Sequence, residues 1–223
     1  NPGNGNEVWR TQVTNPWGTH VAVRAESGGV KLYVTGGFSG SAQFGSVGLR
    51  SRGNSDIFAA KMSGTSGTFE WAEQFGGSGY ESGKAVDVGE GDEVYVVGDN
   101  ADAAVFGPQT LTAGSYLVKL NSSGTFQWVK QIAGTGVTEA NGVAVDRGTV
   151  YVFGDFLGTT DFDTAAVGGT LTSRGARDGF LSRYDATTGS LLAAQRMGGS
   201  GGARWLDVAA DPDFVYAVGR EYS

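Results

Sequence analysis

One histidine, a few aspartates and several aromatic residues are the side chains whose types and spacing could do chemistry in this chain. The 223 residues include a single histidine, His20, and no cysteine, which excludes disulfides, thiolate zinc sites and cysteine nucleophiles. His20 could in principle join a serine and an aspartate, but no stretch resembles a nucleophile elbow. The sequence therefore predicts no catalytic triad.

Two groups of aspartates could bind a metal ion or transfer protons. Asp161 and Asp163, in the segment "DFDT", are calcium candidates, but calcium takes six or more oxygen ligands and this pair supplies too few. Asp87, Asp146 and Asp211 recur with the repeat described below and could act as the acid and base of a hydrolase or lyase. Because such recurrence is typical of structural residues, we expect no catalytic residue, no cofactor and no enzymatic activity.

Aromatic residues accompanied by arginines are typical of binding hot spots. Trp17, Tyr80 and Trp205 fall in predicted connections between repeats and are not matched in residue type from one repeat to the next. Four arginines fall in loops of the same predicted face: Arg52, Arg174, Arg177 and Arg204. We expect these residues to form a surface that binds a protein or a glycan, with ordinary loop packing as the alternative.

One modification site can be read directly from the sequence. Asn121-Ser122-Ser123 matches the acceptor sequence for N-glycosylation and lies at a predicted turn. It matters only in a eukaryotic secretory protein, and such triplets are common by chance.

The composition is that of a folded, acidic protein. Its 39 glycines predict many tight turns, and a hydrophobic fraction of 39% is enough for a core. The net charge of −7 repels phosphate backbones and argues against a nucleic-acid partner. No apolar run approaches the roughly 18 residues that would span a bilayer.

A pattern of paired apolar runs returns about every 60 residues and marks the chain as a repeat protein. Each repeat begins with a run such as "GVAVD", followed by one that ends in glycine: "YVTG", "YVVG", "YVFG" and "YAVG", which begin at Tyr33, Tyr95, Tyr151 and Tyr216. Two such runs separated by polar and glycine residues predict a hairpin. Ala22, Ala85, Ala144 and Ala209 are taken as equivalent positions in the first run.

Two further runs in each repeat alternate apolar and polar residues, as strands do. The third strand is expected over 56–62, 115–120 and 178–184, and the fourth over 69–74, 126–131 and 191–195. Trp9, Trp71 and Trp128 share one place in the fourth strand, which predicts buried contacts between repeats. Phe44, Phe106 and Phe162 follow the glycine of the second strand at one offset, which predicts that they pin the loop behind it.

Four-stranded antiparallel units that repeat without helices predict an all-β fold, a β-propeller whose blades cover one another's apolar faces. About three and a half blades are expected. The expected boundaries are a fourth strand of a preceding blade at 7–13, blades at 20–75, 83–132 and 141–197, and a partial blade at 205–223.

The sequence resembles the seven-bladed β-propeller repeat family of bacterial type. The resemblance lies in "VYVVG" at 94–98, "SDIFAAKM" at 55–62 and "WAEQFGG" at 71–77, and covers nearly the whole chain. It implies a protein that is secreted, at the cell surface or in a lumen, and it carries over no catalytic residues. Because the last unit departs from the family pattern after its second strand, we expect a ring completed by more blades or by another chain.

The functional expectation is a non-catalytic scaffold or recognition module that contacts other proteins. Loops after the second and fourth strands of every unit share one face of an antiparallel blade, and that face holds the aromatic residues and arginines named above. The alternative is a glycan-binding propeller or an accessory domain of a carbohydrate-active enzyme. A propeller enzyme that uses Asp87, Asp146 and Asp211 is a third hypothesis.

Overall fold

The computed structural model describes residues 7–163, 169–211 and 214–222, and these form an all-β protein. Strands β1 to β20 pair in antiparallel sheets, and the described residues contain no helix. Accordingly, none of these ranges holds a helix long and apolar enough to cross a membrane. The all-β prediction is confirmed.

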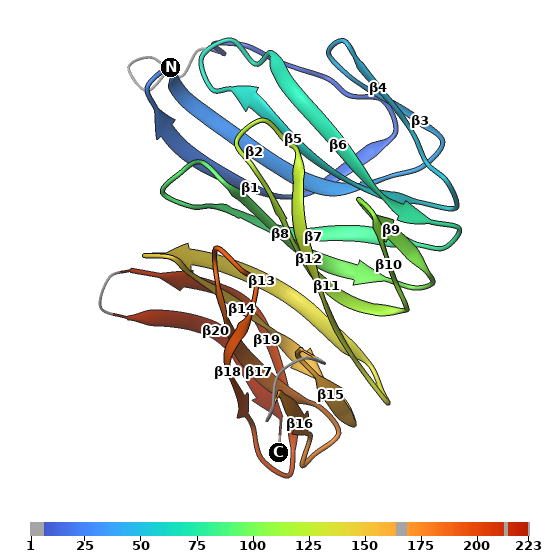
Figure 1. Ribbon diagram of the computed structural model, residues 1–223, viewed down its shortest axis with the longest axis vertical. Helices are drawn as coiled ribbons and strands as arrows, with labels where there is room; N and C mark the ends of the chain where they lie inside the picture. The colour runs from blue at the N-terminus through green and yellow to red at the C-terminus, as the bar shows by residue number, and fades with distance from the viewer. Residues whose placement is uncertain (1–6, 164–168, 212–213, 223) are drawn as a thin grey trace.

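Three groups of four strands, which we call units I, II and III, repeat the same antiparallel order (Figure 1). Unit I consists of β1 (Pro16–Glu26), β2 (Gly29–Phe38), β5 (Asp56–Ser63) and β6 (Phe69–Gly77). Unit II consists of β7 (Glu81–Val88), β8 (Val94–Asn100), β11 (Gly114–Leu120) and β12 (Phe126–Gly134). Unit III consists of β13 (Thr138–Asp146), β14 (Thr149–Phe156), β17 (Asp178–Asp185) and β18 (Leu191–Met197). The terminal hairpin, β19 (Gly202–Ala210) and β20 (Val215–Tyr222), follows unit III.

Each unit also carries a short hairpin between its second and third long strands, which the sequence analysis did not predict. The hairpins are β3 (Ser41–Phe44) with β4 (Val47–Arg50), β9 (Ala104–Phe106) with β10 (Gln109–Leu111), and β15 (Thr159–Asp161) with β16 (Thr170–Thr172). The end of β6 pairs with β9, and the end of β12 pairs with β15. Each of these two hairpins therefore extends the sheet of the preceding unit and ties neighbouring units together.

The strand pairings correct the sequence alignment of the repeats in unit II. Every first strand has a register shift at the same place, between Gly18 and His20 in unit I and between Gly83 and Ala85 in unit II, with matching shifts in β13 and β19. Beyond that shared shift Asp87, and not Ala85, lies opposite Tyr95, where Ala22 lies opposite Tyr33. The predicted equivalence of Ala85 with Ala22 was wrong.

The units pack face to face, and the main core lies between them. One cluster joins Tyr33 and Ile57 of unit I to Val86 and Val118 of unit II. A second cluster joins units II and III in the same way. Phe44, Phe106 and Phe162 are almost fully buried in successive clusters, which confirms the prediction that they pin the loops.

The predicted tryptophan contacts between neighbouring units are present, but Trp71 and Trp128 are half-buried and not buried as expected. Trp71 of unit I donates its indole N–H to the carbonyl of Ser122, in the turn before the fourth strand of unit II, at 3.1 Å. Trp128 of unit II makes the same bond to Thr187 of unit III at 3.2 Å. Both rings also pack against the clusters between the units.

Residues 7–13 make the contacts expected of a fourth strand without being one. Trp9 donates its indole N–H to the carbonyl of Gly64 at 2.9 Å. Val13 packs against the cluster of unit I that includes Phe44 and Phe58. These are the contacts of Trp71 and Phe75 one repeat later. Residues 7–13 nevertheless form no strand, and no strand of the described residues pairs with them.

Candidate functional site

The loops behind the second and fourth strands of each unit share one face, which we call the loop face. Antiparallel pairing sends the chain up one strand and down the next. The short hairpins and the connections at 77–81, 134–138 and 197–202 therefore emerge on the same side. The predicted binding residues all lie on or next to this face.

A pocket of about 390 Å³ opens on the loop face of unit II. It is bounded by the connection from unit I, which carries Tyr80, by Val137 in the connection to unit III, and by Glu139 near the start of β13. Asp99 and Asn100, at the end of β8, line its other side. Tyr80 is 68% exposed, so its ring is available to a ligand that enters the pocket.

Charged side chains from units II and III form a connected network beside this pocket. Lys84 forms an ion pair with Asp99 and lies 3.9 Å from the Glu139 carboxylate. Arg177 contacts Glu139 at 3.2 Å and forms a second ion pair with Asp155. The carboxylates that line the pocket thus have cationic partners, and the network joins the loop ends of the two units.

Burial sets the protonation behaviour of this network. It raises the pKa of the Asp99 carboxyl above its ordinary value of 3.8, although the Lys84 ammonium acts in the opposite direction. Burial likewise raises the pKa of the Asp155 carboxyl, against the effect of the Arg177 guanidinium. Removing the cations would therefore leave two poorly solvated carboxylates.

The pocket wall also contains an acceptor without a partner. Asn100 is 2% exposed, and its amide N–H groups donate to the carbonyls of Asp102 and Thr112 at 2.7 and 2.6 Å. Its Oδ1 atom is buried and accepts no hydrogen bond from the described residues. A buried acceptor in this state is ready to accept a bond from a ligand or a water molecule.

The three aromatic residues expected on one surface have different surroundings. Tyr80 lines the pocket as described. Trp17 in β1 is 43% exposed and its ring covers Gly37. Trp205 was placed wrongly as a surface residue: it is half-buried, with its ring 5.5 Å from that of Phe153 in an edge-on contact. Trp205 lies inside β19 because the strand begins earlier than expected.

The predicted arginines also divide by role. Arg52 is held by its own backbone N–H, which donates to Asp56 at 3.0 Å, and by its guanidinium, which donates to the carbonyl of Gly76 at 3.2 Å. The backbone N–H of Arg174 donates to Asp178 at 2.8 Å. Arg177 belongs to the network beside the pocket, and Arg204 is exposed on β19. Only Tyr80 and Arg177 of the seven expected residues are brought to one site, through Glu139.

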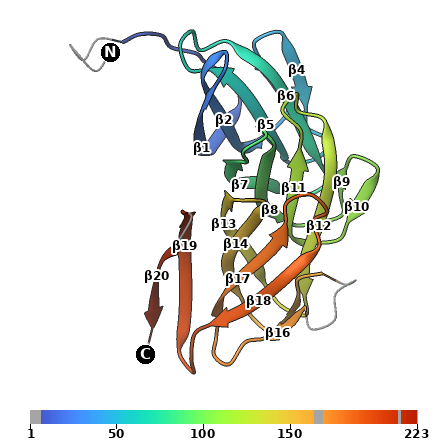
Figure 2. The ribbon, with the colours of Figure 1, turned by 60° about the vertical axis from the view of Figure 1, so that its left-hand side comes forward.

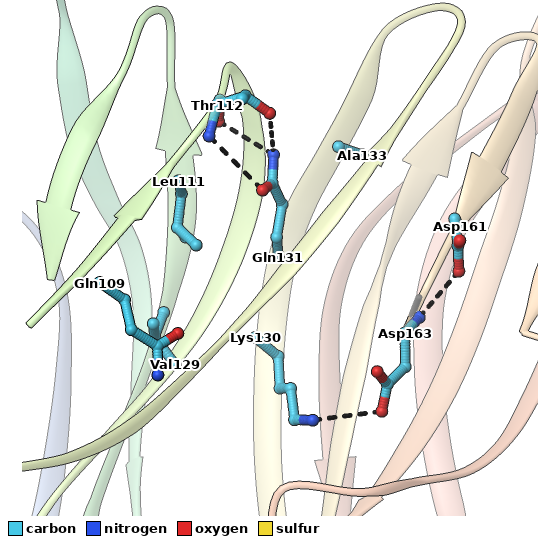
Figure 3. Close-up of a pocket in the computed structure, with 9 residues that line it drawn as sticks. All are labelled: Gln109, Leu111, Thr112, Val129, Lys130, Gln131, Ala133, Asp161 and Asp163. Atoms are coloured by element: carbon cyan, nitrogen blue, oxygen red, sulfur yellow. Dashed lines mark hydrogen bonds and ion pairs between the residues drawn. The ribbon is translucent and has the colours of Figure 1, made fainter. Parts of the chain in front are cut away.

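A second pocket, of about 470 Å³, holds the two calcium candidates (Figure 3). Asp163 points toward Lys130, and their side chains form an ion pair at 3.2 Å. Asp161 accepts a hydrogen bond from the backbone N–H of Asp163 at 3.0 Å. The carboxylates thus serve different partners, and the described residues contain no cluster of three metal-ligating side chains. Thr164 lies outside the described residues.

The three aspartates of the enzymatic hypothesis contact separate parts of the chain. Asp87 accepts hydrogen bonds from the N–H of Val88 at 2.8 Å and from that of Val145 in unit III at 2.7 Å. Asp211 accepts one from the N–H of Phe214 at 2.8 Å, in the turn of the terminal hairpin. Asp146 lies 4.0 Å from the guanidinium of its neighbour Arg147. These contacts are structural and separate.

The remaining candidates are also engaged in local structure. His20 accepts a hydrogen bond through Nδ1 from the N–H of Val86 in the next unit, at 3.3 Å. Asn121 accepts bonds through Oδ1 from the N–H of Ser123 and Thr125 at 3.1 and 2.8 Å. Asn121 therefore shapes its turn, and its glycosylation stays a prediction.

Sequence reasoning did not find Lys84 and Glu139, two of the residues that link the pocket to the network. Their only signal is that each falls at the loop end of a first strand, and no repeat of residue type marks them. A scan against models of known protein families finds no match, and a search of curated proteins finds none either.

Proposed function

We propose that this chain is a non-catalytic recognition module with the architecture of a β-propeller. The four-stranded units are its blades, and the pocket at Tyr80 is its binding site. The module acts outside the cell or in a lumen, as the resemblance of its repeats implies, and its partner is a protein.

Contacts between the first strands of successive units support the propeller arrangement. The bond between His20 and the N–H of Val86 joins β1 to β7. The bond between Asp87 and the N–H of Val145 joins β7 to β13. Asn141 then donates to the carbonyl of Trp205 at 3.0 Å, which joins β13 to β19. In a propeller the innermost strands of neighbouring blades converge in this way around one axis.

The observation that carries the binding role is the exposed ring of Tyr80 at the mouth of a pocket with polar walls. A tyrosine ring supplies a large rigid contact area at a small cost in side-chain entropy, and such residues dominate many interfaces. The pocket lies on loops held by two well-packed units, which is a common position for binding residues. The charged groups beside it are taken up in ion pairs, which supports binding over catalysis.

The test is a binding screen on peptide and glycan arrays with the wild-type chain, a Tyr80→Ala variant and a Leu192→Ala control. Leu192 is 56% exposed on β18, outside the loop face. We expect wild type and control to bind the same peptide, and Tyr80→Ala to bind it at least about tenfold more weakly. Equal affinity of all three proteins for every captured ligand would refute the assignment of the site.

A glycan is the second candidate ligand, and the unpartnered Asn100 acceptor favours it. Sugar hydroxyls are hydrogen-bond donors, and the pocket that Tyr80 lines is also lined by Asn100, Asp99 and Glu139, whose side chains carry acceptor oxygens. Binding that is confined to glycans and lost in both Tyr80→Ala and Asn100→Leu variants would select this candidate over a protein partner.

A further inference from the structure

Two sheet faces at opposite ends of the molecule are uncovered and apolar. The first, which we call the valine face, consists of Val21, Val23 and Val30 on β1 and β2, with exposed fractions of 51%, 66% and 43%. The second, the tyrosine face, consists of Phe214, Tyr216 and Val218 in and next to β20, with exposed fractions of 63%, 54% and 60%. Figures 1 and 2 place unit I and β20 at opposite ends.

The valine face repeats positions that are buried inside the stack. By strand register Val21 and Val23 correspond to Val86 and Val88 of unit II, which are 1% and 6% exposed. Val86 and Val88 are covered by unit I, in the cluster that contains Tyr33. The valine face of unit I is therefore built to be covered by the opposite face of another unit.

The tyrosine face repeats the other half of the same contact. Tyr216 lies opposite Ala209 as Tyr33 lies opposite Ala22, so the two tyrosines hold equivalent positions. Tyr33 and its equivalent in unit II, Tyr95, are buried against the following unit. One molecule thus carries both halves of a junction that it forms internally between its units.

The uncovered part of this side of unit I lies over its first two strands. The outer part of the same face of unit I is already occupied, because Trp9 and Val13 lie on it where a fourth strand would lie. The part that remains open is the area over β1 and β2. In the junction between units I and II, β1 and β2 contact the first strand of unit II, and β5 contacts it as well. The terminal hairpin supplies equivalents of the first two of these strands (Figure 2).

We propose that the valine face binds the terminal hairpin of a second copy of this chain, head to tail. The tyrosine face of one copy packs on the valine face of the next and reproduces the junction between units I and II. A contact of this kind joins two different surfaces, so two copies close into a ring only if their curvature allows both junctions, and otherwise they continue into a chain.

The test is sedimentation velocity of the full chain over a roughly hundredfold range of concentration, with variants at each face. Val23→Asp places a charge on the valine face and Val218→Asp places one on the tyrosine face. Both positions are exposed, so the fold tolerates the charge. Leu192→Asp is the control, at an exposed position on β18 outside both faces.

We expect wild type and control to associate as concentration rises. Each single variant is expected to associate at least about 100-fold more weakly, because an unpaired charge would be buried. An equal mixture of the two variants should form a heterodimer, because each supplies the face that the other has lost.

Two results would overturn the proposal. The first is a wild-type chain that sediments as a single copy at every concentration. The second is a mixture of the variants that does not associate, since complementary rescue is specific to a head-to-tail contact and a contact between two identical faces would not give it.

Discussion

At the scale of single residues, the strongest constraints come from buried carboxylates whose partners lie in other segments. Asp155 has no exposed surface, and Arg177 and Asn141 supply its ion pair and a hydrogen bond at 2.9 Å. Removing one partner of a buried pair costs more than the pair contributes, because the remaining charge is poorly solvated. Arg177 is therefore expected to matter for stability as well as for the shape of the site.

Arg177→Met should lower the free energy of unfolding at neutral pH by about 2 to 4 kcal/mol. The folded-state pKa of Asp155 is already raised by burial, and loss of the guanidinium raises it further. A carboxyl with a raised folded-state pKa binds a proton more readily in the folded protein, so its contribution to stability increases as the pH falls through that pKa toward 3.8. The deficit of the variant should shrink over that range, as measured by urea unfolding at a series of pH values.

Arg147→Met is the matched control for this prediction. Arg147 is 65% exposed, and its contact with Asp146 is at the limit of an ion pair at 4.0 Å. Its loss should change stability by no more than about 0.5 kcal/mol. If the two variants behave alike, or if the deficit of Arg177→Met is the same at every pH, the buried ion pair does not have the role inferred here.

At the scale of elements, the turns between third and fourth strands are where neighbouring units meet. Gly124, in the turn between β11 and β12, has a φ of +84°, and a Cβ atom there would come within 2.8 Å of the Trp71 ring. Gly67 and Gly189 have the same relation to Trp9 and Trp128. The repeat thus places glycine at each turn for two reasons, a left-handed backbone and a ring that covers it.

Gly124→Ala should destabilise the protein more than Gly148→Ala. Gly148 has a similar φ of +75°, but no atom lies within 4 Å of the position that a Cβ atom would occupy there. Its substitution therefore costs only the backbone strain of about 1 to 2 kcal/mol. Gly124→Ala adds a steric conflict with Trp71. Thermal unfolding of both variants measures the difference. Equal melting temperatures would mean that the Trp71 ring moves aside without lowering the stability of the protein.

Much of this element structure could be predicted from the sequence, because the signal is local. The strands predicted at 56–62 and 178–184 lie within β5 and β17, and the tryptophan and phenylalanine contacts were anticipated from their repeated offsets. The register shift in each first strand could not be predicted, because one extra residue in a strand leaves its apolar alternation intact to either side. The misplacement of Ala85 has a different origin, because turns of different length join the first two strands, which pair Glu26 with Gly29 in unit I and Val88 with Val94 in unit II.

The site was harder to predict than the strands because it combines residues from separate units. Tyr80 was identified as an unmatched aromatic residue, and it does line a pocket. Lys84 and Glu139 were missed because they meet only after two units pack, at a distance of 3.9 Å. Trp205 fits the same composition rule as Tyr80, yet it packs on Phe153, because composition does not distinguish a loop from the start of a strand.

At the scale of the whole molecule, protection should depend on how many neighbours a unit has. Unit II is covered on both faces, and nearly every residue of β8 and β11 is buried. Among the described residues, the terminal hairpin packs against unit III through a small cluster that includes Val208 and Phe153. In stacked repeats each unit is stabilised by its immediate neighbours, so an end element opens first.

Hydrogen–deuterium exchange measured by mass spectrometry at low protein concentration should therefore show a steep gradient. Amides of β11 should exchange only through global unfolding, while those of β20 should exchange at least about 100-fold faster through local opening. Raising the concentration should slow exchange in β20 and β1 together, because head-to-tail association covers both, and should leave β18 unchanged. If protection rises in β20 alone, the terminal hairpin binds a surface other than the valine face of the second copy. Equal protection of β20 and β11 in dilute solution would contradict the independent opening of the terminal hairpin.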